Sequence, residues 1–211
     1  VTCAKWDGQS WSHVTEGMSG DIRDLAVFDP DGDYPGQGHL FAAGSLNVPG
    51  RFSSADLLHW DGNIWASFEM SVDSGARHLS VADIDGDGPL PNSLISDSYA
   101  WETSGTALWN GVSWTVYQND FHWNSVWPTS FGIFDDDREG GRSPTFFIGG
   151  GFWSGSDGVR GLTQLNGQDV VGIGNGVWRG IHAIRMIDFD GLGPEKPKLC
   201  AVGNFVAAGN S

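Results

Sequence analysis

Aspartate clusters follow short apolar runs at four points of the chain, and their spacing is the pattern closest to metal chemistry. The two intact copies share the pattern Asp-x-Asp-Gly-Asp and consist of Asp29, Asp31 and Asp33, and of Asp83, Asp85 and Asp87. Alternate carboxylates can converge on a hard cation such as calcium, while the glycine permits a sharp bend. The alternative is that each aspartate caps its own turn by hydrogen bonds, and turn chemistry is the favoured interpretation.

Two degraded copies weaken the calcium interpretation further. Asp135 and Asp137 keep two alternate carboxylates, and Leu192 stands where a third acid would follow Asp188 and Asp190. Calcium therefore remains an open prediction for the intact copies, and no other cofactor is expected.

Tryptophan side chains are the second group that could bind a ligand, because an exposed indole can stack on a sugar ring. Six tryptophans recur in register with a turn motif and are expected to pack between sheets: Trp6, Trp11, Trp60, Trp65, Trp109 and Trp114. The candidates for ligand binding lie outside that motif: Trp123, Trp127, Trp153 and Trp178. Local burial is the alternative for these four residues.

A small set of basic residues recurs at one place of the repeat described below. Arg23, Arg77 and His182 each precede an apolar run, and Thr129 takes this place in the third copy. If these positions converge, they could hold an anion in an otherwise acidic protein. Pairing with a neighbouring aspartate, such as Arg23 with Asp24, is the simpler explanation.

The sequence offers little for catalysis. The six histidines show no close metal-ligand spacing, and no nucleophile-elbow or phosphate-loop motif occurs. Neighbouring acids at Asp135, Asp136, Asp137 and Glu139 could supply a pair of carboxylates for glycoside hydrolysis, but adjacent acids on one turn are usually solvated. The chain is therefore expected not to be an enzyme.

The elements that would position these residues are strands joined by a recurrent turn. Asp-Gly or Asn-Gly between aromatic or branched residues is the strongest short-range hairpin signal. The four copies run over 6–11, 60–65, 109–114 and 165–170, and the last has lost both tryptophans.

The repeat has a length typical of propeller blades. The first aspartates of the acidic turns, Asp29, Asp83, Asp135 and Asp188, are 54, 52 and 53 residues apart. Each copy reads as four short strands, for example 22–28, 39–44, 55–60 and 64–69. We therefore expect an all-β protein, a single four-bladed β-propeller over 1–211, with blades near 22–70, 77–118, 129–174 and 181–205, the last completed by 1–15.

The two termini are predicted to share the fourth blade. The last copy ends after its second strand, 198–203, and the chain begins with a third and fourth strand near 2–6 and 10–14. Cys3 takes the place of Leu57 and Cys200 that of Phe41, so the two cysteines are expected on paired strands. They either form a disulfide or lie together as small apolar thiols.

Composition excludes several classes of partner. The 211 residues carry 26 acidic and 11 basic side chains, a net charge of −15, which disfavours nucleic acid and anionic membrane surfaces. No apolar run is long enough to cross a bilayer. The chain begins with Val1 and its first methionine is Met18, which favours a mature secreted protein.

The motifs around the turns resemble a known family. The segments 4–8 (AlaLysTrpAspGly), 25–29 (LeuAlaValPheAsp) and 147–152 (PheIleGlyGlyGlyPhe) resemble the tandem repeats of secreted bacterial propellers related to kelch and galactose-oxidase-type propellers. The turn at 83–87 is also similar to calcium loops of integrin-type propellers, although Pro91 and Asn92 stand where a final carboxylate would be. This resemblance implies the fold and carries little about activity.

The sequence thus predicts a non-catalytic, lectin-like binding module for a glycan or a protein partner, with the ligand held by loops on one face. A structural or assembly module without a small ligand is the first alternative, and a polysaccharide-acting enzyme the second. A monomer is expected, with strand exchange between two chains as an alternative.

Overall fold

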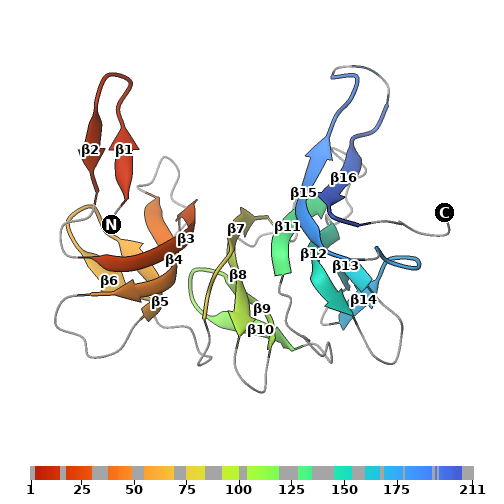
Figure 1. The fold of residues 1–211 in the computed structure, drawn as a ribbon, viewed down its shortest axis with the longest axis horizontal. Helices are drawn as coiled ribbons and strands as arrows, with labels where there is room; N and C mark the ends of the chain where they lie inside the picture. Colours follow the sequence, from red (N-terminus) through yellow and green to blue (C-terminus); the bar gives the residue numbers. More distant parts are fainter. Residues whose placement is uncertain are drawn as a thin grey trace. The chain divides into compact units, whose positions relative to one another are not determined.

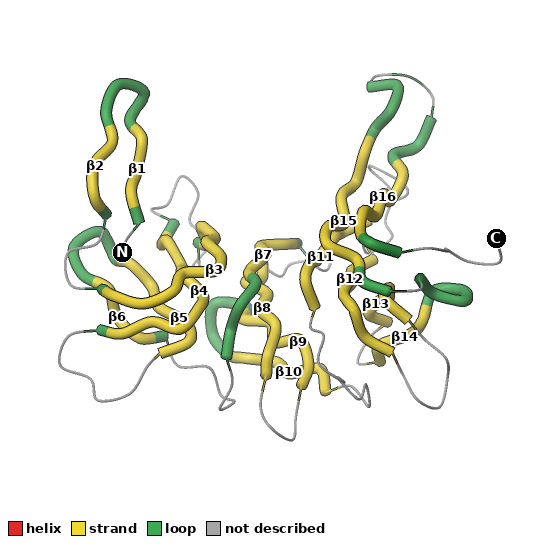
Figure 2. Tube along the Cα trace, in the orientation of Figure 1, coloured by secondary structure: helices red, strands yellow, loops and turns green. Residues whose placement is uncertain are grey.

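The structure is a computed structural model in which every described element is a strand, turn or loop (Figures 1 and 2). The described residues are 3–14, 18–29, 38–48, 55–68, 75–83, 92–99, 104–118, 128–134, 145–153, 160–166, 169–177, 179–191, 193 and 195–205. The predicted all-β class is confirmed. Within these ranges, no helix has the length and apolar character of a membrane span.

The chain divides into two compact units, and each is described by itself. Unit 1 comprises Val1–Val81 and Pro91–Val116, and unit 2 comprises Ala82–Leu90 and Tyr117–Ser211. The single closed ring remains a prediction.

Unit 1 contains one hairpin and two antiparallel sheets. The N-terminal hairpin is β1 (Ala4–Trp6) with β2 (Trp11–His13). Sheet 1 consists, in spatial order, of β3 (Ser19–Phe28), β4 (His39–Asn47), β5 (Ala55–Trp60) and β6 (Trp65–Ser67). Sheet 2 consists of β7 (Leu79–Ala82), β8 (Ser93–Tyr99), β9 (Ser104–Trp109) and β10 (Trp114–Gln118).

Unit 2 contains one sheet and one hairpin. Sheet 3 consists of β11 (Pro128–Phe134), β12 (Thr145–Trp153), β13 (Arg160–Asn166) and β14 (Asp169–Gly172). The C-terminal hairpin is β15 (Ile181–Ile187) with β16 (Lys198–Gly203). Four sequential antiparallel strands per sheet match the predicted repeat, and each terminal hairpin has half that number.

The recurrent turn has the same geometry in three copies. In each, the side-chain oxygen of the first turn residue accepts two backbone N–H groups at 2.8–3.0 Å, and these residues are Asp7, Asp61 and Asn110. The following glycines have φ of 100°, 102° and 93°, a region that side chains disfavour. The predicted hairpins are therefore confirmed, and Asp or Asn serves equally well because only the oxygen is used.

The core of unit 1 lies between its two sheets. Phe28, Phe41 and Leu57 of sheet 1 pack against Leu79 and Leu94 of sheet 2, and all five side chains are buried. Their alternation along the strands places them on one face of each sheet. The contact fixes sheet 2 on this face of sheet 1.

The core of unit 2 lies between sheet 3 and the C-terminal hairpin. Ile181 and Ile184 of β15 are fully buried. They pack with Phe147 of β12 and with Val177, which are also buried. A Cβ atom on Gly149 would come within 2.6 Å of the Ile184 side chain. This glycine is therefore required for the close approach of β15 to sheet 3.

Candidate functional site

A β-bulge marks the same repeat position in three first strands. The register shifts between Ile22 and Asp24, between Pro128 and Ser130, and between Ile181 and Ala183. The residues inside the shifts are Arg23, Thr129 and His182, each six positions before its acidic turn. A bulge leaves one residue unpaired and re-aims its side chain. Three of the four repeat positions considered for an anion, all but Arg77, thus share a backbone irregularity that periodicity did not reveal.

The residue after the bulge links neighbouring sheets. The Asp24 carboxylate accepts the Leu79 N–H of sheet 2 at 2.9 Å, and the Ser130 hydroxyl accepts the Ile184 N–H of the C-terminal hairpin at 2.9 Å. The proposed pairing of Arg23 with Asp24 is wrong, because Arg23 pairs with Asp21 at 3.1 Å. Asp24 instead uses its oxygens for the backbone N–H groups of Leu25 and Leu79.

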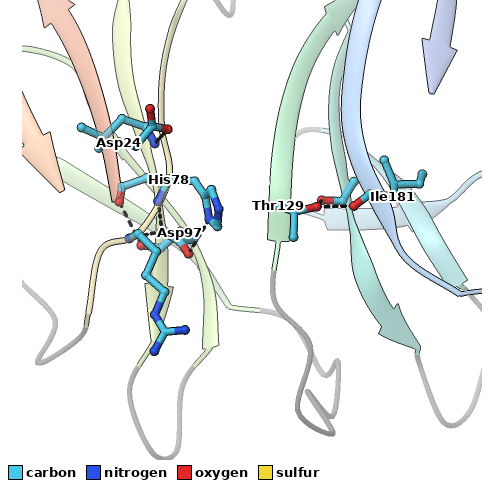
Figure 3. A network of polar contacts seen from close by, with 9 residues as sticks. Asp24, His78, Asp97, Thr129 and Ile181 are labelled. Atoms are coloured by element: carbon cyan, nitrogen blue, oxygen red, sulfur yellow. Dashed lines mark hydrogen bonds and ion pairs between the residues drawn. The ribbon is translucent and has the colours of Figure 1, made fainter. Parts of the chain in front are cut away.

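In sheet 2 the corresponding place is held by a buried carboxylate (Figure 3). Asp97 on β8 is 2% exposed and accepts the N–H groups of Arg77 and His78 at 2.7 and 2.9 Å. Its second oxygen lies 3.3 Å from His78 Nδ1. Arg77 therefore precedes β7 because its amide is bound to this side chain, and the expected start of the second blade at residue 77 is two residues too early.

In unit 2 the bulge residue Thr129 contacts the next hairpin directly (Figure 3). Its hydroxyl donates to the Ile181 carbonyl oxygen, and Ile181 is followed by the bulge residue His182. The two repeat-equivalent bulges of unit 2 are thereby brought side by side.

A cavity of about 650 Å³ opens at this place, and its described lining residues all belong to unit 2. Thr129 and His182 line it together with Gly151 and Phe152 of β12. Phe152 is buried, as are Val177 and Ile181, which also line the cavity. A volume of this size lies within the range of roughly 300–1,000 Å³ that is usual for ligand sites.

The described lining of the cavity contains basic residues. Arg160, Arg179 and His182 line it, and the described lining includes no Asp or Glu. Arg179 has φ of 80°, the one positive value among the described non-glycine residues. Such a backbone conformation is uncommon for a residue with a side chain.

Polar groups near the cavity have fixed orientations. The Asn204 N–H donates to the Gly180 carbonyl at 3.1 Å, and the Gly180 N–H donates to Asn204 Oδ1 at 3.0 Å. Among the described residues, Asn204 Nδ2 has no hydrogen-bond partner, so it remains as a donor at the cavity wall. The Val177 N–H donates to the Arg160 carbonyl at 2.8 Å, which ties two segments of the wall together.

The remaining predicted ligand residues are placed only in part. Trp123, Trp127 and Trp178 lie outside the described residues, and Trp153 ends β12 with its side chain not described. Arg23 and Arg77 belong to unit 1 and do not line the cavity.

The predicted calcium ligands are also placed only in part. Asp29 and Asp83 lie just after β3 and β7, whereas Asp31, Asp33, Asp85 and Asp87 lie outside the described residues. Within the described ranges, no three acidic, His or Cys side chains gather in a metal-binding arrangement. In the fourth turn, Asp188 Oδ1 accepts the Asp190 N–H at 3.3 Å, and Asp190 Oδ2 accepts the Glu195 N–H at 2.9 Å. That turn uses the hydrogen bonding expected of turn chemistry.

Both cysteines are free thiols, so the predicted disulfide is not present in this structure. Cys3 precedes β1 and Cys200 lies on β16. Partial burial raises the pKa of the Cys3 thiol above its ordinary value, which keeps it protonated near neutral pH.

Sequence reasoning missed much of the cavity wall. Arg160, Arg179 and Asn204 occupy no repeated motif, and they meet only because β13, the segment before β15 and the end of β16 converge. A weak signal was present in the glycine-rich stretch 172–180, which predicts an irregular path before β15.

Comparisons of the chain with protein-family models, curated proteins and solved structures give no match.

Proposed function

We propose that the chain is a four-bladed β-propeller that acts as a non-catalytic, secreted glycan-binding module. Its first three blades are sheets 1, 2 and 3, and the fourth combines the C-terminal hairpin with the N-terminal hairpin. The observation that carries the binding function is the basic, partly apolar cavity of unit 2.

Equivalent residues of sheet 1 support the shared fourth blade. In sheet 1, Ala42 and Leu46 on β4 pack with Trp65 of β6, which is 5% exposed. The equivalents of the first two on the C-terminal side are Ala201 and Phe205, which are partly buried. The equivalent of Trp65 is Trp11, which is 70% exposed within unit 1. In the proposed ring, the N-terminal hairpin docks beside β16, which buries Trp11 together with Ala201 and Phe205.

Two further exposed faces support closure of the ring. Leu25 on β3 is 43% exposed, whereas its equivalents Leu79 and Ile184 are buried against the preceding sheets. Val202 on β16 is 60% exposed, whereas its equivalent Ala43 is buried against sheet 2. These are the two faces that a fourth blade and a first blade present to each other in a ring.

The sheet 1 register specifies how the two cysteines lie in this ring. In β4 and β5, Phe41 pairs with His59, and Ala43 pairs with Leu57. By equivalence Cys3 lies opposite Val202, so Cys200 is its diagonal neighbour. Diagonal Cα atoms are about 7–8 Å apart, beyond the usual separation of a disulfide. The proposed ring therefore contains two neighbouring thiols, the alternative that the sequence left open.

The lining of the cavity favours a sugar as its ligand. Phe152 and Val177 offer an apolar surface to the face of a sugar ring, and Asn204 Nδ2 offers a donor to its hydroxyl groups. Catalysis by paired carboxylates would need two acids, and the described lining contains none. These features support binding without turnover.

A glycan array tests this function. Wild-type protein is expected to give reproducible hits. His182→Trp is expected to lose them, because His182 lines the cavity and the larger indole would fill it. The His182 side chain is exposed and outside the core, so the fold should tolerate this change. His182→Gln is the matched control, since it keeps the polarity and leaves the cavity open. A blank array with wild-type protein contradicts the function, and hits that persist in His182→Trp place the ligand elsewhere.

A further inference from the structure

The cavity of unit 2 is a basic site in an acidic protein. The chain carries a net charge of −15, yet Arg160, Arg179 and His182 line this cavity and no described lining residue is acidic. An anion that approaches most of the surface is repelled, whereas one inside the cavity is attracted. The charge distribution therefore favours an anionic ligand at this place.

Arg179 gives an independent indication that the site is used. A positive φ is unfavourable for any side chain, and glycine would remove this strain. Backbone strain of this kind gathers at ligand sites, where the surrounding structure maintains it. Among the described residues, none forms an ion pair with the Arg179 guanidinium. Within the described part of the chain, its charge is thus not neutralised by an acidic partner.

The shape of the arginine side chain narrows the class of anion. The planar guanidinium donates two parallel hydrogen bonds to a carboxylate, and Arg179, which lines the cavity together with Arg160, offers such a group. The hydrogen bond from Val177 to the Arg160 carbonyl links the segments that carry them. The backbone segments of the two arginines are therefore tied together before a ligand arrives.

The rest of the cavity exceeds what a small inorganic anion needs. Phe152, Val177 and Ile181 form an apolar part of the lining, and Thr129 and Asn204 provide hydroxyl and amide groups. A sugar ring matches this combination, because it has an apolar face and a hydroxyl rim. We propose that the cavity binds the carboxylate-bearing residue of an acidic glycan, an inference that rests on the proposed function.

Isothermal titration calorimetry with D-glucuronate, D-glucose and sodium sulfate tests the inference. We expect glucuronate to bind at least about tenfold more tightly than either glucose or sulfate, and its affinity to fall as salt is raised. Arg179→Gly is expected to weaken glucuronate binding about tenfold or more through the lost charged hydrogen bonds. Its Tm should be unchanged or higher, because glycine relieves the strain at this φ.

Arg185→Gln is the matched control. Arg185 lies on β15 and is exposed, but it does not line the cavity, and the change removes the same charge. Equal affinity for glucose and glucuronate overturns the inference, and so does unchanged glucuronate binding in Arg179→Gly. If sulfate binds as tightly as glucuronate, the claim that the ligand is a sugar is wrong. A wild-type protein that binds no glucuronate also overturns the inference. If neutral glycans still bind to wild-type protein and this binding is lost in His182→Trp, the proposed function stands without the further inference. A blank glycan array contradicts both the proposed function and the further inference.

Discussion

Two copies of the same tryptophan hairpin show how local and tertiary structure separate in this chain. In the N-terminal hairpin the Trp6 and Trp11 ring centroids are 5.5 Å apart at 46°, and in sheet 1 those of Trp60 and Trp65 are 5.6 Å apart at 45°. Beyond the turn, one hydrogen bond also repeats: Val14 N–H to the Cys3 carbonyl at 3.0 Å, and Phe68 N–H to the Leu57 carbonyl at 2.9 Å.

Burial separates the two copies. Within unit 1, Trp6 and Trp11 are exposed, whereas Trp65 lies in a core cluster with Ala42 and Leu58. The hairpin sequence thus determines its own turn, its register and the packing of its two indole rings. The neighbouring strands determine whether these rings are buried. Sheet 1 has these strands next in its own ladder. In the proposed ring, the N-terminal hairpin obtains them from the other end of the chain.

A designed disulfide gives the largest expected effect. Val202 is the residue expected opposite Cys3, so Val202→Cys combined with Cys200→Ser is expected to form an intramolecular disulfide on mild oxidation. The loop-entropy model assigns a closure of nearly the whole chain about 4–5 kcal/mol. Mass spectrometry and a non-reducing gel identify the product, and wild-type protein with its diagonal pair is the control.

The products of that oxidation separate three arrangements. An intramolecular bond supports closure within one chain, and a covalent dimer indicates strand exchange between two chains. Free thiols after oxidation contradict the shared fourth blade.

Alanine substitutions at the two equivalent tryptophans sharpen the comparison. Trp65→Ala should destabilise the protein by about 3–5 kcal/mol, because it removes a buried aromatic side chain. In the proposed ring, Trp11→Ala should cost about 2–4 kcal/mol, less because its neighbour is Ala4 where Trp65 has Leu58. Urea unfolding measures both losses.

The control for these substitutions is Val112→Ala, at an exposed position in the hairpin of sheet 2. It should change the free energy of unfolding by less than about 0.5 kcal/mol. If Trp11→Ala is as stable as this control, the N-terminal hairpin does not dock. The two tryptophan hairpins then share only their local geometry.

The smallest effect concerns acid stability. Hydrogen bonds from the Ile64 and Asn63 amides lower the pKa of Asp61, and those from the Ser10 and Gln9 amides lower the pKa of Asp7. A lowered carboxyl pKa adds stability that is present above the unfolded value of about 3.9 and is lost as pH falls through the folded value. Asp61→Asn should therefore lose less Tm than wild type between about pH 5 and about pH 2.5.

Asn110 provides the precedent for this substitution, since its side-chain oxygen accepts the same two amides without titrating. Asp7→Asn should show the same reduced acid sensitivity if the N-terminal hairpin unfolds together with the rest. If Asp61→Asn loses as much Tm at low pH as wild type does, the acid-dependent part of the stability does not come from Asp61.

Much of the fold was predictable because it depends on short-range chemistry. The expected strands 55–60 and 198–203 agree with β5 and β16. Strand ends near long-range contacts were less accurate, and β7 begins at Leu79 because Asp97, on another strand, binds the Arg77 and His78 amides.

The candidate site was predictable only where it belongs to the repeat. The position shared by Thr129 and His182 followed from the period, whereas Arg160, Arg179 and Asn204 have no repeat equivalents that mark them. Their meeting depends on three segments from unit 2 that are distant in sequence, and one sequence contains no direct signal of such convergence.

By itself, the sequence determined the β class, the repeat, the turns and the tryptophan pairs, because these depend on residues within a few positions of each other. Only the tertiary structure decided which sheet faces pack, that Asp24 bonds Leu79 rather than Arg23, and that a basic cavity opens beside His182. The physical reason is that burial and convergence depend on contacts between residues far apart in the sequence, such as the Asp97 and Asp24 hydrogen bonds, which join residues 20 and 55 positions apart.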